Sequence, residues 1–396
     1  MAIGLIKQNT IIGIESESTE GTYVAPSAST SYITPLSDGF ESSPAREVID
    51  RGLLNASPGK ETPRLGIKSV SSALPVEFRA SGIEGADVDH GLLIKGALGA
   101  TRSGVTKNTS GVSTSTVLAL ADGDGANFNI GDIVVVKRSG LHEARPITAV
   151  STTPGSNSIT LAFALDNGAP PTTTPISAFK TYYTSASGHP SLSLSYYWGN
   201  EIREGAIGSK VTSMSLDNYQ TGQVASLNFG LEGLSYSHID GAAPHTPAYD
   251  TGLPPIILSA CVYRNGVAMS LNAFGLSLSN TLGFLTSTCS ANGRISSRVT
   301  DREITGTINP YKDDTSVAYF TDWNAGTEFS LFALAYNPSS TTGNFDMGSV
   351  VGVWLPQCFT TEFKVGEVEG ILADEMGFRA TRGAQGTSEE CYMGLI

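Results

Sequence analysis

Strict alternation of apolar and polar residues is the strongest pattern along this chain. In residues 191–198, Leu192, Leu194, Tyr196 and Trp198 alternate with serine or with a second tyrosine. Successive side chains of a β-strand point to opposite faces, so this segment is predicted to be a strand with one apolar and one mostly small, polar face. The apolar face is expected to lie on a core.

A second alternating pair, residues 209–217 and 223–235, is separated by residues 218–222, which contain Asn and Gly. Two such runs joined by turn residues predict an antiparallel hairpin. In its second strand the predicted inward residues are Ala225, Leu227, Phe229 and Leu231, and the predicted outward residues are Ser226, Asn228 and Glu232.

Most of the remaining chain is also predicted to form β-strands. Further strands are predicted at residues 256–264, 269–279, 303–308, 329–336, 348–355, 360–365 and 377–382. In residues 269–279 the apolar positions change parity around Gly275, which predicts a β-bulge. Two short helices are predicted: residues 87–98, with Asp87 as N-cap, and residues 314–325.

Two regions differ from this main body in composition and in the pattern of apolar residues. Residues 106–180 have Gly- and Thr-rich borders around short strand candidates and predict a small inserted β-barrel; the candidates are residues 116–120, 132–138, 144–150 and 158–165. Residues 1–68 predict an extended N-terminal arm with the first elements of the main domain, which comprises residues 69–105 and 181–396. The arm has apolar anchors at Tyr23, Tyr32, Phe40, Leu53 and Leu54.

The amino-acid composition argues against several classes of function for this protein. The chain has 24 Lys and Arg against 37 Asp and Glu, a net charge of −13, which argues against an electrostatic grip on nucleic acid or on an anionic membrane. Charged residues make up 15% of the 396 residues, well below the roughly 25% of an average protein, and 44 glycines favour strands and turns. Polar residues 7–9 interrupt any signal-peptide core, and the four scattered cysteines are expected to be buried free thiols.

Catalytic and metal-binding patterns are weak. The five histidines lack metal-ligand spacing, and no nucleophile-elbow, P-loop or dinucleotide-binding glycine pattern occurs. Residues 122–127 begin like a calcium loop, but Asn127 and Ile133 occupy the positions of its required Gly and Glu. The acidic residues 362–375 are interpreted as a solvated face. We therefore expect a non-enzymatic protein with no catalytic residue, cofactor or metal.

Several motifs resemble the major tail tube proteins of long-tailed, siphovirus-type bacteriophages. The motifs are Gly21-Thr-Tyr-Val-Ala-Pro26, Tyr32-Ile-Thr-Pro35, Pro63-Arg-Leu-Gly-Ile-Lys68, Leu74-Pro-Val-Glu-Phe-Arg79, and the segments of residues 206–216 and 222–233. The resemblance covers nearly the whole chain outside residues 106–180. It implies an all-β tail-tube fold of two packed antiparallel sheets with a flanking short helix, for which residues 314–325 are the candidate.

The resemblance also implies an assembly. Copies would form hexameric rings stacked into a tube, the arm and a long loop would reach the adjacent ring, and the insert would lie outside. The tube would carry double-stranded DNA during ejection without binding it specifically. Implied partners are the tape measure, tail terminator and distal tail proteins, and the implied location is the virion tail, assembled in the host bacterial cytoplasm. Candidate lumen-facing residues are Ser213, Ser215, Asp217, Ser226, Asn228 and Glu232.

Two other classes remain open at the level of sequence. A carbohydrate-binding or adhesive β-sandwich would also be rich in Ser, Thr and Gly, and would need an exposed aromatic platform such as Tyr182-Tyr183 or residues 196–198. An enzyme on a sandwich fold would need a histidine-centred constellation, which the spacing does not supply.

Overall fold

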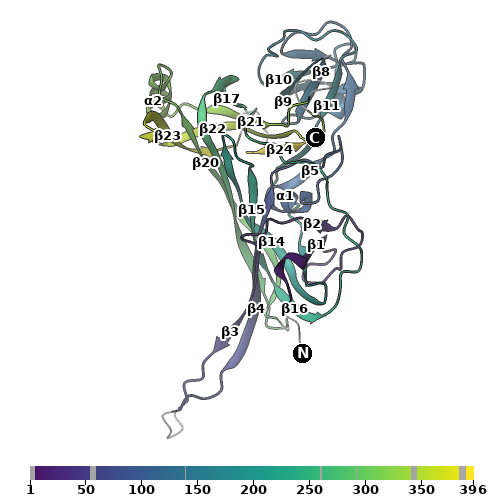
Figure 1. Ribbon diagram of the computed structural model, residues 1–396, viewed down its shortest axis with the longest axis vertical. Coiled ribbons are helices and arrows are strands. Elements are labelled where there is room, and N and C mark those ends of the chain that lie inside the picture. The colour runs from purple at the N-terminus through teal and green to yellow at the C-terminus, as the bar shows by residue number, and fades with distance from the viewer. Residues whose placement is uncertain are drawn as a thin grey trace.

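The computed structural model describes residues 5–53, 59–138, 140–258, 261–290, 292–339, 346–382 and 389–396. Strands make up 53% of the protein and helices 7%, so the chain is all-β, as the alternation predicts. The strands form one 18-stranded and one 6-stranded hydrogen-bonded system. Figure 1 shows the larger system as a tall column, with the smaller one at its upper end.

The column is built on a long antiparallel sheet. Across it lie β3 (Glu41–Ile49), β4 (Arg64–Glu77), β15 (Ser226–Gly233), β14 (Ile202–Gln220), β19 (Leu271–Thr286) and β20 (Arg294–Pro310). The predicted hairpin is confirmed as the ladder between β14 and β15. Its predicted inward residues, from Ala225 to Leu231, are at most 3% exposed, because this face of the sheet lies on the core.

A shorter sheet packs against the same core. It contains β2 (Tyr32–Ile33), β1 (Ile11–Ser16), β13 (Leu192–Trp198), the first part of β14 and β16 (Ser235–Asp240). β14 therefore belongs to both sheets, and the change falls between Ile207, which pairs with Ser235 of β16, and Lys210, which pairs with Glu232 of β15. A register shift between Val211 and Ser213 follows within the long sheet. Apolar side chains from both sheets join one cluster, which confirms the predicted packing of two antiparallel sheets.

The upper end of the column continues from β20 through a second group of strands. β20 pairs with β23 (Ile371–Ala380), which pairs with β22 (Val351–Val368). One edge of the first part of β22 pairs with β21 (Phe329–Ala335), which is followed by β17 (Cys261–Arg264) and β18 (Val267–Met269). The opposite edge pairs with β24 (Tyr392–Leu395), which is followed by β12 (Lys180–Thr184) and β5 (Gly99–Arg102). The last residues of the chain thus complete this layer.

Both predicted helices are present, in different settings. α2 (Ser316–Ala325) lies on the outside of β22, where Phe320 and Trp323 pack on Phe363. α1 (Gly91–Leu98) lies in the core, with Leu93, Ile94, Ala97 and Leu98 fully buried.

The predicted start of the first helix at Asp87 is wrong. α1 begins at Gly91, and the carboxylate of Asp87 pairs with Lys180 instead of capping the helix. Long-range contacts fix the preceding residues in a non-helical path: Asp89 donates its backbone N–H to Asp250 at 2.7 Å and accepts a bond from Arg79 at 2.9 Å.

The 6-stranded sheet has the order β6 (Thr106–Asn108), β11 (Pro175–Ala178), β8 (Ile133–Arg138), β9 (Leu141–Ser151), β10 (Ser158–Leu161) and β7 (Val117–Ala119). A bridge between Thr109 and Leu120 joins its outer strands. It has its own apolar cluster, while Ile133, Val135 and Ala144 share a second cluster with the upper strands. The sheet is therefore attached to the column by apolar contacts. The short helices η1 (Lys7–Asn9) and η2 (Asp124–Asn127) complete the fold.

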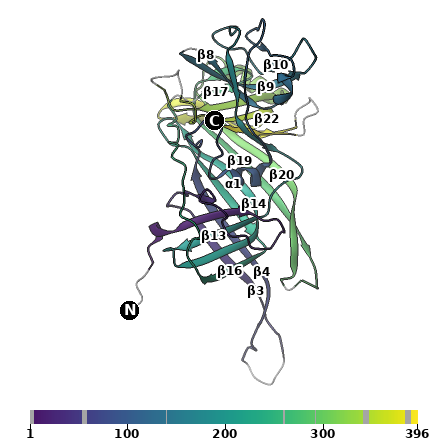
Figure 2. The same ribbon diagram turned by 90° about the vertical axis from the view of Figure 1, so that its right-hand side faces the viewer.

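The N-terminal segment differs from the extended arm that the sequence predicts, because much of it packs on its own chain. Residues 17–24 lie on the serine face of β13, where Glu17 accepts bonds from Ser191 and Ser193 and the Tyr23 hydroxyl contacts Ser195 at 2.8 Å. The second face of β13 is consequently buried as well. Beyond this segment, β3 and β4 form a hairpin that projects from the lower end of the column (Figures 1 and 2).

Candidate functional surface

One face of the long sheet carries all six of the predicted polar positions. The ladder places Asp217 opposite Ser226, Ser215 opposite Asn228 and Ser213 opposite Gly230. Directly opposed residues of an antiparallel pair point to the same face, so these side chains form one continuous row. The intervening residues, such as Leu216, point into the core.

The same face continues onto the neighbouring strands. On β19 and β20, Ser215 is followed by Ser277 and Thr305, and Ser213 is followed by Ser279 and Glu303. On the other side, β15 places Ser226, Asn228 and Glu232 opposite Glu77, Pro75 and Ser71 of β4. We call this surface the hydroxyl face. It crosses five strands and is composed largely of small polar side chains.

The hydroxyl face is acidic. Its carboxylates include Glu77, Asp217, Glu232, Asp301 and Glu303. Its basic groups include Arg294, Arg298 and Arg379, together with Lys210, which is buried against Glu20. Arg294 lies 3.2 Å from Glu232, and Arg379 lies 3.5 Å from Glu303. Among the described residues, Asp217 is bonded to neutral neighbours, the Ser215 hydroxyl at 3.1 Å and the Asn228 amide. Negative charge therefore remains on the face after the ion pairs are formed.

The six predicted residues differ in accessibility. Ser213 and Asp217 are exposed, and Ser215, Asn228 and Glu232 are half-buried. Ser226 is only 5% exposed, so it contributes little to the accessible surface.

The five predicted arm anchors are separated in space. Tyr32 is fully buried, Tyr23 lies under Arg203, and Phe40 stacks on Trp198 at 5.9 Å, all within their own chain. Leu53 is exposed on the projecting β3–β4 hairpin, and Leu54 lies outside the described residues. The first three residues would reach another copy only by leaving these contacts.

The two buried cysteines, Cys358 and Cys391, are not activated for chemistry. Burial raises the pKa of Cys391 to about 12 and also raises that of Cys358, so both thiols stay protonated at neutral pH. The expectation of burial is wrong for Cys289, which is exposed in the turn after β19, and for Cys261, which is half-buried. Across the described ranges, no group of His, Cys, Asp and Glu side chains could hold a metal ion, and no helix is long and apolar enough to cross a membrane.

The aromatic residues proposed for a sugar platform are mostly internal. Tyr182, Tyr196 and Tyr197 are at most 2% exposed. Tyr183 lies beneath Arg102, with 4.2 Å between the guanidinium and the ring. These positions do not offer the open ring faces that carbohydrate stacking requires.

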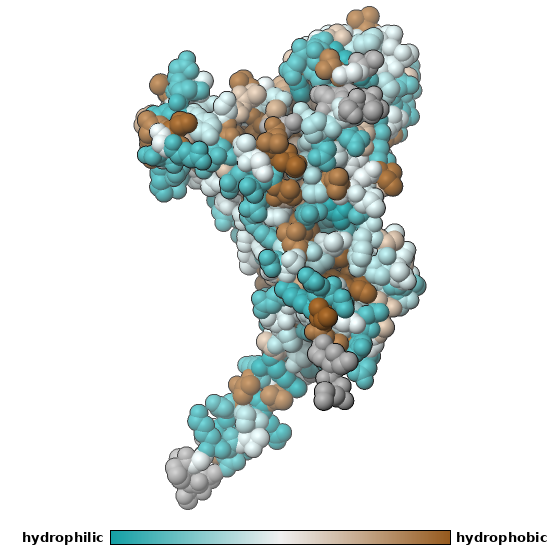
Figure 3. Space-filling view, in the orientation of Figure 1, coloured by the Kyte–Doolittle hydropathy of each residue, from teal (hydrophilic) through white to brown (hydrophobic). Residues whose placement is uncertain are grey.

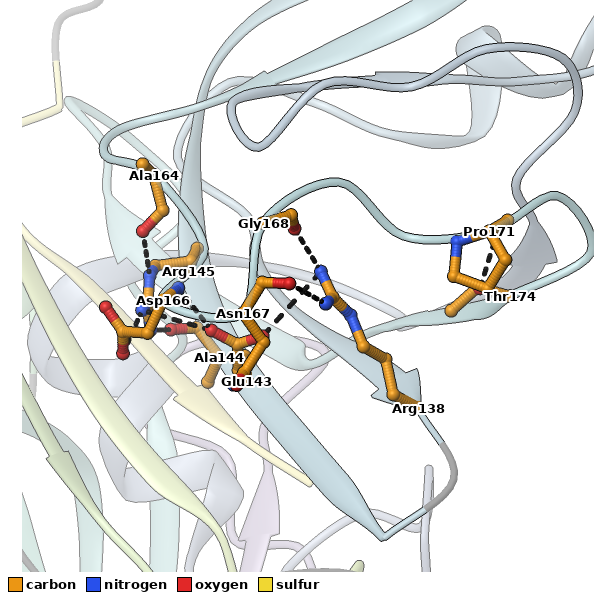
Figure 4. A network of polar contacts seen from close by, with 10 residues as sticks. All are labelled: Arg138, Glu143, Ala144, Arg145, Ala164, Asp166, Asn167, Gly168, Pro171 and Thr174. Carbon is orange, nitrogen blue, oxygen red and sulfur yellow. Dashed lines mark hydrogen bonds and ion pairs between the residues drawn. The ribbon is translucent and has the colours of Figure 1, made fainter.

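Sequence reasoning missed a buried arginine where the 6-stranded sheet meets the column. Arg145 is 2% exposed and donates to the Ala164 carbonyl at 3.2 Å and to Asp166 at 2.9 Å (Figure 4). Its guanidinium also lies over Phe163, which follows β10, and over Tyr263 of β17, at 4.6 and 5.6 Å. The alternating pattern of β9 gave no signal for this contact, because the rings come from distant segments.

The comparisons agree with the fold. A family model described as "Phage tail tube protein" matches residues 7–380. A search of curated proteins returned no match. Because the family model spans nearly the whole chain, including both sheets of the column, the protein belongs to the phage tail tube protein family and is a structural component of the virion tail.

Proposed function

We propose that copies of this protein form hexameric rings, that the rings stack into the tail tube, and that the hydroxyl face lines a channel for DNA ejection. The observation that carries this proposal is the continuous polar face of the long sheet, whose other face is core. A sheet that is two-faced over five strands suits a wall between protein and water.

The chemistry of the hydroxyl face supports passage instead of binding. Serine and threonine side chains are short and neutral, and the carboxylates repel phosphates over a Debye length of roughly 8–10 Å at physiological salt. The arginines at positions 294 and 379 are each held by a carboxylate, which reduces their attraction for DNA. Ser213, Ser215, Asp217, Asn228 and Glu232, with Ser226 beneath them, are the proposed lumen residues.

The strand edges support lateral assembly. In the described part of the chain, β3 is paired only with β4, and β20 is paired with β23 over Thr305–Ile308 alone on the side away from β19. Unpaired edges are templates for strands of another copy. Pairing of such different edges is heterologous and closes into a ring when the rotation permits.

The remaining assignments follow from this arrangement. Residues 69–105 and 181–396 are the tube domain, residues 1–68 supply the N-terminal segment and projecting hairpin with Leu53, and residues 106–180 are an inserted domain on the outside. The tape measure, tail terminator and distal tail proteins are the proposed partners, and assembly takes place in the host cytoplasm.

Electron microscopy of the purified protein tests the assembly. We expect sixfold rings and tubes of uniform width, with the hydroxyl face inward at higher resolution. A protein that stays monomeric at all concentrations, or tubes with this face turned outward, would contradict the proposal.

A substitution tests the role of the lumen. Ser213→Arg with Ser215→Arg should give normal tubes but slower DNA ejection, with the defect reduced at high salt because the added charges bind phosphate. Ser110→Arg, on an exposed serine outside the hydroxyl face, is the control. Equal ejection rates for both variants would remove these serines from the lumen.

A further inference from the structure

The C-terminal strand β24 and the two residues that flank it are covered on both faces. Cys391, Met393 and Leu395 belong to the apolar cluster of the column, whereas Tyr392 and Ile396 belong to the cluster that the 6-stranded sheet shares with the upper strands. All five side chains are at most 3% exposed. Successive side chains of a strand point to opposite faces, so one face of β24 lies on the column and the other lies under the 6-stranded sheet.

One side chain of the 6-stranded sheet fits closely onto the layer that contains β24. Gly352 of β22 and Gly394 of β24 are directly paired. A Cβ atom added at Gly352 or at Gly394 would lie 3.0 or 3.1 Å from Cδ1 of Ile133 in β8. This methyl group therefore occupies the space that two absent side chains leave. Figures 1 and 3 show the 6-stranded sheet seated directly on the upper end of the column, above the end of the chain.

Ion pairs border this apolar contact. Lys137 of β8 pairs with Glu84, which lies between β4 and α1, and Arg102 of β5 lies 3.4 Å from Asp132, which precedes β8. Charge pairs across an interface fix its register more than they strengthen it. The apolar fit and the ion pairs together seat the 6-stranded sheet in one orientation above β24.

β24 needs such support, because it has only four residues and lies at the end of the chain. Chain ends are poorly ordered unless they are tied down. β24 pairs with β12 along one edge and with β22 along the other. Its departure would leave both neighbours with an unpaired edge, and such edges are templates for pairing with another chain. The position of β24 therefore matters for the whole upper layer.

We propose that the 6-stranded sheet acts as a clamp that holds β24 in the upper layer of the column. This function concerns the folding of each copy, and it goes beyond the proposed role in the tube. With Ile133 seated over Gly352 and Gly394, β24 leaves the layer only after the 6-stranded sheet has moved away. The chain enters and leaves the 6-stranded sheet through β5 and β12, which are paired with each other, so the clamp is anchored beside the strand that it holds.

Two graded substitutions in the full-length protein test the clamp. Ile133→Ala shortens the fitted side chain, and Ile133→Asp places a carboxylate in the contact. Ile133 is not part of the internal apolar cluster of the 6-stranded sheet, so that sheet should keep its own fold. The measurement is hydrogen exchange by mass spectrometry on dispersed protein, expressed as the amide exchange rate of residues 392–395 divided by that of residues 211–216 in β14. This exchange ratio should rise at least about tenfold in Ile133→Ala and further in Ile133→Asp, because β24 then opens locally.

Ile308→Ala is the matched control. Ile308 is as fully buried as Ile133, but it lies in β20, which pairs with β19 and β23. The same truncation there should weaken the whole column, so the exchange ratio should stay within about twofold of wild type.

A compensating pair of substitutions tests the fitted contact itself. Gly352→Ala should also raise the exchange ratio, because the added Cβ would lie 3.0 Å from Cδ1 of Ile133, while the next atom, on Phe332, is 3.5 Å away. Ile133→Val removes that Cδ1 methyl group. Gly352→Ala with Ile133→Val should therefore return the ratio to within about threefold of wild type, as expected for two residues in direct contact.

Several outcomes would overturn the clamp. An unchanged exchange ratio in Ile133→Ala would make the 6-stranded sheet a passive attachment, and so would an equal rise in Ile133→Ala and Ile308→Ala. If Ile133→Asp does not fold, Ile133→Ala decides the question, since it keeps an apolar side chain at this position. A Gly352→Ala variant that Ile133→Val does not rescue would contradict the fitted contact. All of these results are independent of ring and tube formation.

Discussion

The ion pair between Glu20 and the buried Lys210 offers the sharpest test of how the N-terminal segment is held. Lys210 is 3% exposed, its ammonium lies 3.1 Å from the Glu20 carboxylate, and it also donates to the Ser297 carbonyl. The same carboxylate accepts bonds from the backbone N–H and hydroxyl of Ser297. One side chain from the N-terminal segment thus joins β14 to β20.

Glu20→Gln removes the charge and keeps an oxygen that can accept from Ser297. Breaking a buried ion pair by removing one partner costs about 3–5 kcal/mol, because the other charge stays buried without compensation. Since Gln retains one hydrogen bond, we expect a loss at the lower end of that range, about 3 kcal/mol in the free energy of unfolding. Glu20→Gln with Lys210→Met should recover at least half of this loss, because the uncompensated ammonium is gone.

Urea unfolding followed by tryptophan fluorescence measures both variants, under conditions where the protein is dispersed. The midpoint should fall while the slope with urea stays constant, which shows that stability changed and not the extent of unfolding. Glu328→Ala, an exposed carboxylate, should stay within about 0.5 kcal/mol of wild type. A loss below about 1 kcal/mol for Glu20→Gln, or a double variant as unstable as the single one, would refute the reasoning.

Three further predictions concern the body of the protein. Leu278→Ala, at a buried position where β14 meets β19, should lower the free energy of unfolding by about 2–5 kcal/mol in the same urea assay. Gly131→Ala should lower the melting temperature, because φ there is +87° and an added Cβ would meet the ring of Tyr392. Burial acts to raise the pKa of Asp89, but its bond with His90 and the charge of Arg79 lower it overall. Its stabilising contribution is therefore present above the unfolded pKa near 3.8 and is lost as pH falls through the folded value, so Asp89→Asn should flatten the acid side of a plot of melting temperature against pH.

The alternation of apolar and polar residues was sufficient to predict those strands in which it continues over many residues. β13, β14 and β15 were predictable because each shows the two-residue period without help from the rest of the chain. The polar face of β13 was not predicted to be buried, since Tyr23 and Glu17, which cover it, are about 170 positions away in sequence. Long-range cover of this kind leaves no trace in a local pattern.

The hydroxyl face, too, was predictable only where its strands are close together in sequence. The pairing of Ser215 with Asn228 could be inferred from one hairpin, because the turn sets its register. The extension of the hydroxyl face to Thr305 and Glu303 depends on pairings between strands that are far apart in sequence, and only the structure supplies them.

The bulge in β14 connects the fold to the proposed channel. A shift of one residue in a strand moves every side chain to the other face. Within the long sheet, Val211 lies opposite Leu231 and Ser213 lies opposite Gly230, so Thr212 is an extra residue in β14. An unbulged strand would turn Met214 and Leu216 toward the hydroxyl face and bury Ser213 and Ser215. The register shift thus keeps the apolar residues of β14 out of the proposed channel wall. Deletion of Thr212 should therefore be far more damaging than Thr212→Ala, and equal melting temperatures for the two variants would contradict this account.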